Sequence, residues 1–399
     1  MRIASWTITA ALCLAASTAF GADRKYGPGV SDTEIKIGQT MPYSGPLSAY
    51  GAIGKAEAAY FKMVNEKGGV NGRKIDFVTL DDGYQPPKTV EVTRKLVEED
   101  QVLGIVGSLG TPTNVAIHKY LNGKQVPQLF VATGATEWGD PEHFPWTMGW
   151  QPSYQVEGHI YARYIMKNLP NTKVAVLYQN DDAGKDYLKG ITDGFGDKAG
   201  KFIVKAVSYE VTDPTVDSQV VTLQSSGADT FFNPAAPKQA AQAIRKAYDV
   251  GWKPKQFLGS ISASVQSVLK PAGFEKAAGL ITAAYLKDPT DKTWANDPAY
   301  KDWLAWMKKY NPEGSVEDSF NVYGYTVAMT VVKVLQKCGN DLTRENLMKQ
   351  AANMNFELPM LLPGIKVNTA PTNFFPVHQM HLQKFDGEKW ILFGDVIGG

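Results

Sequence analysis

Cysteine is nearly absent from this sequence, which has only Cys13 and Cys338 among 399 residues. Cys13 lies in an N-terminal apolar stretch that we expect to be removed during export, which leaves Cys338 without a partner. An intramolecular disulfide in the mature chain is therefore excluded, even in an oxidising compartment. The stability of the fold must come from packed apolar cores.

An excess of charge of one sign is also missing, because 41 lysine and arginine residues face 40 aspartate and glutamate residues. Such a balance offers no strong field to nucleic acid or to an anionic membrane, so neither is predicted as a partner. Beyond the N-terminus, the sequence lacks any run of about 20 uncharged apolar residues, the length that a membrane-spanning helix needs. We expect the mature chain to be soluble.

The N-terminus itself has the composition of a secretory signal peptide. A positively charged start precedes an uncharged apolar run over residues 3–16, and small residues follow over 19–22. The run is too short for a permanent membrane anchor. We predict a signal peptide over residues 1–22, cleavage near residues 21–22 and a periplasmic mature protein.

Motifs of catalysis and cofactor binding are missing as well. The sequence has no G-x-S-x-G elbow, no P-loop and no nucleophile paired with a base. Gly104, Gly107 and Gly110 are spaced three apart, whereas a dinucleotide-binding turn needs its first two glycines two positions apart. The five histidines form no metal cluster, and His378 and His381 would point to opposite faces of a strand. We therefore predict no cofactor, no metal site and no enzymatic activity.

Two series of alternating strand and helix patterns fill a chain that is too long for one core. The first series predicts strands over 34–38, 74–80, 102–107 and 128–132 and helices over 50–66, 87–99 and 111–121. The second predicts strands over 174–179, 202–209, 229–233 and 256–260 and helices over 184–199, 216–225 and 238–250. Such alternation is typical of a parallel sheet covered by helices. We expect an α/β fold with two Rossmann-like lobes, each built on a parallel central sheet.

The remaining segments connect and complete these lobes. Residues 146–153 are extended in character and are interpreted as the first crossing between lobes. After a strand pattern at 280–285, we predict helices and then two strands, over 299–310, 320–337, 343–353, 378–385 and 389–394. Four aromatic residues around the first of these helices are interpreted as packing rather than as a binding site: Trp294, Trp303, Trp306 and Tyr310.

Two loops that follow strands of the first series are candidates for ligand binding, because α/β sheets bind ligands at the carboxyl ends of their strands. Residues 107–113 combine glycines with hydroxyl side chains before a helix, which suits an anion at the helix N-terminus. A capped helix start, with Pro112 at its first position, explains the same residues without a ligand. Residues 132–138 form a second small, hydroxyl-rich loop, which a simple turn would also explain.

Several motifs together make the chain resemble the leucine/isoleucine/valine-binding protein family. They are Ser44–Gly51 followed by a helix, Asn65–Arg73, Asp81-Asp82 with Pro86, the two loops at 107–113 and 132–138, and Tyr178–Gly184. The resemblance covers essentially the whole mature chain. It implies the type I periplasmic binding-protein fold, in which three crossovers form a hinge. We expect lobe 1 to comprise 28–150 plus 284–374 and lobe 2 to comprise 151–283 plus 375–399.

The resemblance also implies a function as the substrate-binding component of an ABC importer. The partners would be a small-molecule carboxylate, an inner-membrane permease and its ATPase subunits, and the protein itself would be a monomer. The ligand would dock on lobe 1, and lobe 2 would close over it by rotation about the hinge. An extracytoplasmic sensor remains an alternative, because docking surfaces carry no motif. A secreted hydrolase of small acids is a more remote alternative.

In that family, hydroxyl side chains and backbone amides of the two loops hold the carboxylate of the ligand. Hydrogen bonds to a charged group contribute about 1.5–3 kcal/mol each. Tyr50 corresponds to a tyrosine that lies over the ligand, and Phe320 to an aromatic residue before a late helix of lobe 1. The corresponding loop residues here are Leu109, Gly110 and Thr111 in the first loop and Gly134, Ala135 and Thr136 in the second.

The sequence departs from the family at the positions that recognise an amino acid. Where amino-acid binders place an acid for the ligand's ammonium group, this chain has Ile261, which cannot pair with a buried charge. Two tyrosines that close the amino-acid pocket from lobe 2 are replaced by Ala183 and, within residues 233–237, by Ala235 or a neighbour. Small residues there leave room for a larger ligand, and a free amino acid becomes a poor candidate.

Aromatic residues near the predicted cleft indicate the kind of ligand. The positions of the family's lobe-1 disulfide correspond to Tyr84 and Gly110, so Tyr84 is available to turn toward the cleft. Trp138, at the end of the second loop, is another candidate contact. The pattern favours an aromatic or aryl-alkyl carboxylate, such as a benzoate or a phenylpropenoid acid. Branched-chain or other aliphatic acids, amino acids and amides remain alternatives.

Overall fold

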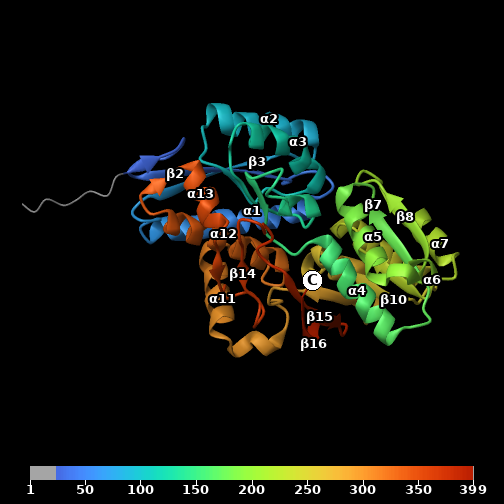
Figure 1. Cartoon of the computed structure of the whole chain (residues 1–399). Helices are drawn as coiled ribbons and strands as arrows, with labels where there is room; N and C mark the ends of the chain where they lie inside the picture. The colour runs from blue at the N-terminus through green and yellow to red at the C-terminus, as the bar shows by residue number, and fades with distance from the viewer. Residues whose placement is uncertain (1–23, 399) are drawn as a thin grey trace, which may run out of the picture.

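The computed structural model describes residues 24–398. The predicted signal peptide and its cleavage site therefore lie outside the described residues. The described chain forms two lobes, which lie side by side in Figure 1, and each has a central sheet with helices packed around it. This arrangement confirms the predicted α/β fold with two lobes.

The sheet of lobe 1 has five strands: β2 (Glu34–Met41), β3 (Lys74–Asp81), β4 (Ile105–Val106), β5 (Gln128–Val131) and β6 (Thr147–Gly149). They are all parallel, in the order β3-β2-β4-β5-β6. Their side chains are largely apolar because helices cover both faces of the sheet. β4 is shorter than predicted, although the backbone continues to bond to its neighbours through Leu103 and Gly107.

Helices cover both faces of this sheet: α1 (Gly51–Glu66), α2 (Pro86–Arg94), α3 (Thr111–Gly123), α11 (Pro298–Tyr310), α12 (Ser319–Cys338) and α13 (Arg344–Ala351). In Figure 1, α2 and α3 lie on one side of β3, while α1 and α12 lie on the other. A Cβ at Gly324 of α12 would stand 2.4 Å from the carbonyl oxygen of Ile53 in α1. Glycine is therefore required for these two helices to pack so closely.

The sheet of lobe 2 has seven strands: β7 (Val174–Gln179), β8 (Ile203–Tyr209), β9 (Thr230–Asn233), β10 (Lys255–Leu258), β11 (Ile281–Ala284), β15 (Gln379–Phe385) and β16 (Trp390–Gly398). Their order is β16-β15-β11-β10-β9-β7-β8. The first five in sequence are parallel, whereas at one edge β15 is antiparallel to β11 and β16 is antiparallel to β15. Lobe 2 therefore has a mixed sheet with a parallel core.

The helices of lobe 2 are α4 (Tyr154–Asn168), α5 (Asp182–Phe195), α6 (Ala199–Phe202), α7 (Asp217–Gln224), α8 (Pro237–Asp249), α9 (Lys270–Ala272) and α10 (Phe274–Ala277). α4 and α5 touch through glycines, since a Cβ at Gly158 would lie 2.5 Å from the backbone nitrogen of Ile191. α5 begins two residues earlier than predicted because Asp181 caps it, accepting a hydrogen bond from the Gly184 N–H at 3.0 Å. This close pair of helices fixes the wall of lobe 2 that faces lobe 1.

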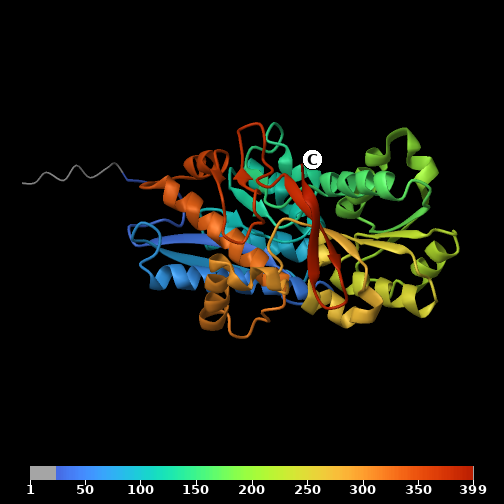
Figure 2. The same ribbon diagram turned by 90° about the horizontal axis from the view of Figure 1, so that it is seen from below.

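The chain passes between the two sheets three times. The passes follow β6, follow β11, and join the small hairpin of β13 (Asn355–Phe356) and β14 (Val367–Asn368) to β15. Figure 2 shows β15 and β16, in red, at the boundary between the two lobes. β15 is bound to β11 in antiparallel register, with Ala284 opposite His381. Two of the three connecting segments are thus joined by backbone hydrogen bonds.

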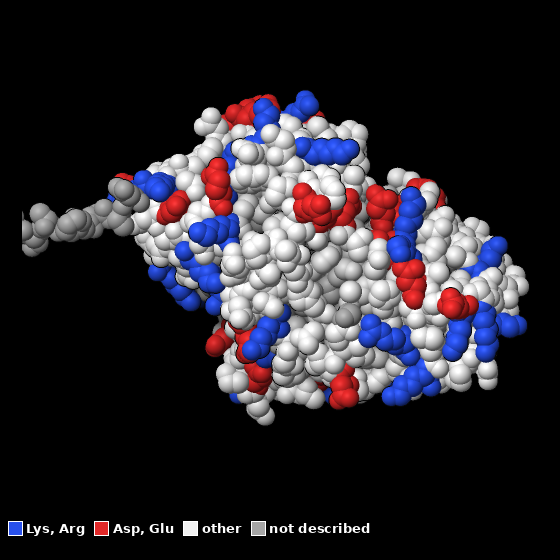
Figure 3. All heavy atoms as spheres, in the orientation of Figure 1, with Lys and Arg blue, Asp and Glu red and all other residues white. Residues whose placement is uncertain are grey.

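Charged side chains of both signs are interspersed over the face in Figure 3, as the balanced composition implies. The middle of that face, where the two lobes meet, is largely uncharged. Within residues 24–398, none of the helices combines the length and apolar character needed to cross a membrane.

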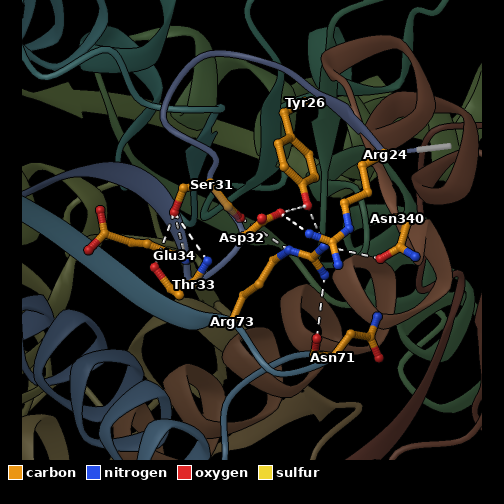
Figure 4. Close-up of polar contacts among 9 residues, drawn as sticks. All are labelled: Arg24, Tyr26, Ser31, Asp32, Thr33, Glu34, Asn71, Arg73 and Asn340. Atoms are coloured by element: carbon orange, nitrogen blue, oxygen red, sulfur yellow. Dashed lines mark hydrogen bonds and ion pairs between the residues drawn. The ribbon is translucent and has the colours of Figure 1, made fainter. Parts of the chain in front are cut away.

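A polar cluster around Arg73 ties the N-terminal segment to lobe 1 (Figure 4). Its guanidinium group donates to the Tyr26 hydroxyl at 2.7 Å and to Asn340 Oδ1 at 3.0 Å. Tyr26 in turn donates to Asp32 at 2.6 Å, and its strand β1 (Lys25–Tyr26) pairs with β12 (Asp341–Leu342). The end of the Asn65–Arg73 motif therefore holds the lobe together and is remote from the ligand loops.

Candidate functional site

A cavity of about 120 Å³ lies between the lobes. Its walls come from the segments after β2, β3, β4 and β5 and the start of α12 in lobe 1, after β7, β9 and β10 in lobe 2, and from the hinge after β11. Parallel α/β sheets bind ligands at these carboxyl ends of strands. An engineered apolar cavity of roughly 150 Å³ in another protein holds one benzene molecule. The space therefore suits a ligand with about one ring.

Aromatic side chains dominate the walls. Tyr50 and Phe320 are in contact, with ring centroids 5.0 Å apart, and Tyr154 stacks on Tyr187 at 4.2 Å. Burial raises the pKa of each of the six tyrosines that line the cavity, so each keeps its hydroxyl proton at neutral pH. The aromatic residues that line the cavity are Tyr50, Tyr84, Tyr154, Tyr187, Tyr285, Tyr323 and Phe320.

The structure brings many of the sequence-predicted residues to this cavity, though not all of them. The predicted residues that line it are Tyr50, Tyr84, Leu109, Gly110, Thr111, Ala183, Ile261 and Phe320. Those that do not line it are Gly134, Ala135, Thr136, Trp138 and Ala235. Lining residues that the sequence did not single out include Thr133, Gln151, Tyr154, Gln179, Tyr187, Ser260, Tyr285 and Tyr323.

The first loop places the N-terminus of α3 at the cavity. Gly110 precedes the helix with a φ of 103°, a value that favours glycine. The ring of Tyr84 packs against it, because a Cβ at Gly110 would stand 2.4 Å from Tyr84 Cε2. The first N–H groups of a helix have no acceptor within the helix. Gly110 and Thr111 therefore offer donors and a positive helix end to the cavity.

The second loop reaches the cavity through Thr133. The hydroxyl oxygens of Thr111 and Thr133 are 2.5 Å apart, and Thr133 also donates to the Tyr154 hydroxyl at 3.2 Å. Thr136 lies further along and is engaged by Asp186 of lobe 2, which accepts from its N–H at 2.6 Å and from its hydroxyl at 2.9 Å. Thr136 thus joins the lobes at the edge of the cleft.

Trp138 is fully buried away from the cavity. Its ring meets the edge of His118 with centroids 5.1 Å apart, and His118 stacks on Phe144 at 3.8 Å. Burial lowers the pKa of His118 to about 4, so the imidazole is neutral. This aromatic group supports the second loop from behind.

The wall of lobe 2 is more aromatic than Ala183 and Ala235 suggested. Ala183 and Ala236 line the cavity, while Ala235 is fully buried behind them. Tyr187 lies one helical turn after Ala183 and fills the space over Tyr154. A tyrosine is therefore present on this wall, on a different turn of α5 from the position expected by resemblance.

A buried carboxylate, Glu157 of α4, lies directly behind this wall. It is 1% exposed and accepts four hydrogen bonds, all from lobe 2. The donors are the Ser260 N–H and hydroxyl, both at 2.7 Å, the Tyr161 hydroxyl at 2.7 Å and the Tyr187 hydroxyl at 3.0 Å. Burial raises the pKa of Glu157, and these hydrogen bonds oppose the rise. Ser260 and Tyr187 both line the cavity, so this acid lies one residue away from it.

Contacts across the cleft show that the two lobes are closed. The Tyr50 hydroxyl of lobe 1 donates to the Ile261 carbonyl of lobe 2 at 3.2 Å. At the edge of the cleft, Glu137 faces Asp181, Asp182 and Asp186 of lobe 2. Burial and these acids together raise the pKa of Glu137 to about 7.

Two charged residues of the hinge border the cavity. Lys287 is buried and pairs with Asp297, with Nζ and Oδ2 2.8 Å apart. Burial raises the pKa of Asp288 to about 6. Within the described part of the chain, no group of three or more histidine, cysteine or acidic residues is arranged to hold a metal ion.

Two lobes that enclose a small cavity at the ends of their strands define a solute-binding protein. The family model for periplasmic binding proteins matches residues 34–389, and the chain belongs to this family. More narrowly, it is a type I member of the Leu/Ile/Val-binding group of ABC transporter solute-binding proteins. These are binding proteins rather than enzymes.

Known proteins of this group resemble the chain over most of its length. The Leu/Ile/Val-binding protein homolog 1 of Brucella suis biovar 1 (strain 1330) is 24% identical over 348 residues, covering 85% of this chain and 86% of the relative. A branched-chain amino acid ABC transporter protein from Thermus thermophilus with bound valine has a TM-score of 0.82 and 17% identity, covering 93% of this chain and 98% of its own.

Two further structures concern other ligands. A fatty acid ABC transporter substrate-binding protein from Thermomonospora curvata has a TM-score of 0.78 and 25% identity, covering 94% of this chain and 95% of its own. A solute-binding protein from R. palustris in complex with benzoate has a TM-score of 0.77 and 21% identity, covering 92% and 98%. The shared fold therefore serves several ligand classes, and the ligand of this chain must be argued from its own residues.

Proposed function

We propose that this chain is the binding component of an importer for an aromatic or aryl-alkyl carboxylate, which it encloses between its lobes. One observation carries the ligand class: seven aromatic rings surround a cavity of about 120 Å³ that has hydroxyl and amide donors at one end. The rings suit a flat apolar body, and the donors suit an anion.

The carboxylate would lie on lobe 1, against the N-terminus of α3. The free N–H groups of the first helical turn lie there, and the helix dipole favours a negative charge. Thr111 donates to Thr133 and Thr133 donates to Tyr154, so this chain of hydroxyls leaves the Tyr154 proton for the ligand. In this proposal Thr133 takes the role predicted for Thr136, because Thr136 is held by Asp186. Leu109 and Gly110 supply backbone at the same end of the cavity.

The ring of the ligand would lie between the lobes, against Tyr50 and Phe320 on one side and Tyr154 and Tyr187 on the other. Aromatic pairs of this kind contribute about 0.5–1.5 kcal/mol beyond the area they bury. Ile261 closes the wall near Tyr50 and adds an apolar contact.

The ligands named for the three structural neighbours support the carboxylate part of this proposal. Valine, a fatty acid and benzoate differ in shape, but each combines a carboxylate with an apolar portion. In this chain, the aromatic lining and the small cavity favour the benzoate-like member of that set over a long aliphatic chain.

The partners follow from the same role. The closed form would be recognised in the periplasm by an inner-membrane permease with its ATPase subunits, after export directed by residues 1–22. A receptor or sensor kinase would be the partner if the protein served as a sensor instead. Transport of the ligand by cells that lack this chain separates the two roles, because a sensor is dispensable for uptake.

Replacing a hydroxyl at the donor end tests the carboxylate position. We expect Thr111→Val and Thr133→Val each to weaken benzoate binding about tenfold or more, since each change breaks the chain of hydroxyls that directs the Tyr154 proton to the carboxylate, and a hydrogen bond to a charged group contributes about 1.5–3 kcal/mol. Isothermal titration calorimetry measures the affinities. Thr326→Val is the matched control, because that buried hydroxyl bonds to the Val322 carbonyl outside the cavity. Unchanged affinity in both cavity variants would place the carboxylate elsewhere.

A second candidate ligand is a branched-chain amino acid, and Glu157 is the observation that favours it. No acid stands at position 261, but this buried carboxylate comes from α4 to lie behind Ser260. An ammonium group beside Ser260 would feel its negative charge. Tight binding of leucine or valine, with no binding of benzoate, would establish this alternative.

A further inference from the structure

The direction of the hydrogen bonds behind the lobe-2 wall limits what the ligand can present to it. A serine or tyrosine hydroxyl has one proton to donate. Ser260 gives its proton to Glu157 Oε2 at 2.7 Å, and Tyr187 gives its proton to the same oxygen at 3.0 Å. Both hydroxyl oxygens keep lone pairs but have no proton left for a ligand.

The partners of Glu157 match an ionised carboxylate. The backbone N–H of Ser260 can only donate, and it reaches Glu157 Oε1 at 2.7 Å. The Tyr161 hydroxyl lies 2.7 Å from the same oxygen and 2.8 Å from the Leu258 carbonyl oxygen. Because that carbonyl already accepts from Thr282 at 2.8 Å, we assign the single Tyr161 proton to Glu157. Each carboxylate oxygen of Glu157 thus accepts two hydrogen bonds, which suits an ionised carboxylate.

The hydroxyl of Tyr154, at the start of α4, has the reverse polarity. The Tyr154 hydroxyl accepts from Thr133 at 3.2 Å and from Gln151 Nε2 at 3.4 Å, so its own proton is uncommitted. Tyr154 lines the cavity beside Thr111 and the N-terminus of α3. The hydroxyls of Ser260 and Tyr187 thus form an acceptor wall on lobe 2, while the Tyr154 hydroxyl supplies a donor at the end of the cavity where it meets Thr133 of lobe 1.

We propose that Glu157 is a specificity-determining residue, which makes Ser260 and Tyr187 of the lobe-2 wall hydrogen-bond acceptors and selects acids that carry an O–H or N–H donor apart from the carboxylate. The inference rests on the proposed function, because it assumes that the carboxylate lies on lobe 1. A hydroxy-substituted aromatic acid has this chemistry, and so does an amino acid. A buried lone pair left without a donor disfavours an analogue that lacks the group.

The experiment compares matched ligands by isothermal titration calorimetry on the purified mature protein. The probes are 3- and 4-hydroxybenzoate against the corresponding methoxybenzoates, and leucine against 4-methylpentanoate. In at least one of these pairs, we expect the unmodified protein to bind the acid with the extra O–H or N–H donor about tenfold more tightly than the acid that lacks it.

In Glu157→Gln, the amide nitrogen can donate to Ser260 or Tyr187, which frees a hydroxyl proton for the cavity. The donor preference should therefore shrink severalfold or reverse, whereas a purely structural role would weaken both members of a pair equally. Glu57→Gln is the matched control, since Glu57 is also buried but lies in α1, outside the cavity. If Glu157→Gln does not fold, Ser260→Ala removes one acceptor and should reduce the same preference.

The outcomes separate this inference from the proposed function. Selectivity for leucine that Glu157→Gln removes, with no binding of any benzoate, would support the acceptor wall and overturn the aromatic ligand class. Binding of benzoates with no preference for hydroxyl over methoxy groups, or with the same preference in folded Glu157→Gln and Ser260→Ala, would overturn the acceptor wall and leave the proposed function standing.

Discussion

Two threonine hydroxyls, 2.5 Å apart, connect loops that are 22 residues apart in the sequence. Thr111 opens α3 and Thr133 follows β5, so the ends of two adjacent parallel strands bring them together. Both side chains are at most 2% exposed, and a buried hydroxyl is costly unless it is hydrogen-bonded. The pair is therefore a pre-formed polar end of an otherwise aromatic cavity.

The reactivity of the Cys338 thiol reports on how well the core around it is packed. Its thiol is 5% exposed at the end of α12, and burial raises its pKa to about 12. The thiolate is the reactive form, so the native protein should resist thiol reagents at pH 8. We expect dithionitrobenzoate to modify the mature protein only in denaturant. Rapid modification of the folded protein would mean that the end of α12 opens.

Which residues line the cavity could be predicted from the sequence where they closely follow a strand, but less well within the longer loops. Thr111, Ile261 and Ala183 follow strand ends closely, and each lines the cavity. The second loop holds two similar threonines, and nothing in their spacing tells that Asp186, 50 residues away, binds Thr136. Glu157 could not be predicted as a site residue, because a lone acid in an amphipathic helix is usually on the surface.

At the scale of elements, the junction of β4 and α3 depends on one glycine. Gly110 combines a φ of 103° with a position under the Tyr84 ring, so the helix N-terminus and the aromatic wall meet at a residue without a side chain. Tyr84 itself has a φ of 59°, which places its ring over that helix start. Tyr84 and Gly110 are the two positions at which the resemblance places the family's disulfide, and here the two residues are in van der Waals contact instead.

Gly110→Ala should therefore disturb both stability and binding. A Cβ would stand 2.4 Å from Tyr84 Cε2, and the backbone strain alone costs about 1–3 kcal/mol. We expect a lower Tm by calorimetry and weaker ligand binding. Gly123→Ala, at the other end of the same helix, meets open space and should leave both unchanged. Equal behaviour of the two variants would contradict the tight junction.

Most elements could be read from periodicity because each strand is apolar and each helix has one apolar face. The strand β7, for instance, has the predicted bounds Val174–Gln179. Which strands pair with each other was harder to predict. The antiparallel pairing of β15 with β11 joins residues about a hundred positions apart, and no local sequence pattern specifies it. The bounds of β4 also depend on neighbours, because only two residues complete its ladder.

At the scale of the whole molecule, lobe closure creates the environment of Glu137. The N–H and hydroxyl of Thr136 bind Asp186 across the cleft, and Gln155 adds a hydrogen bond to Asp186 at 2.7 Å. This contact carries Glu137 against three acids of lobe 2. Closure therefore brings like charges together, and a proton on Glu137 relieves the repulsion.

Ligand affinity should consequently depend on pH. The pKa of Glu137 is about 7 in the closed form, against an ordinary value of 4.5 that open lobes would restore. A raised pKa in the closed form favours closure at low pH, with the benefit lost as pH rises through 7. We expect affinity to fall about three- to tenfold between pH 5.5 and pH 8, a range discounted for partial exposure.

The control for this pH dependence is Glu137→Gln, which keeps the shape of the side chain without the charge. Its affinity should be high and nearly constant over the same range, apart from a residual contribution of Asp288. Titrations at pH 5.5, 6.5 and 8 in one buffer mixture measure both proteins. An equal slope in the variant would assign the effect to another group.

The central claim, a ring-bearing carboxylate enclosed between the lobes, is tested most directly by calorimetric titration of the mature protein with benzoate, cinnamate, octanoate and leucine. The cavity of about 120 Å³ and its seven aromatic rings predict tight binding of an aromatic acid, with octanoate and leucine at least about tenfold weaker. Tighter binding of leucine or octanoate than of both aromatic acids would contradict the account.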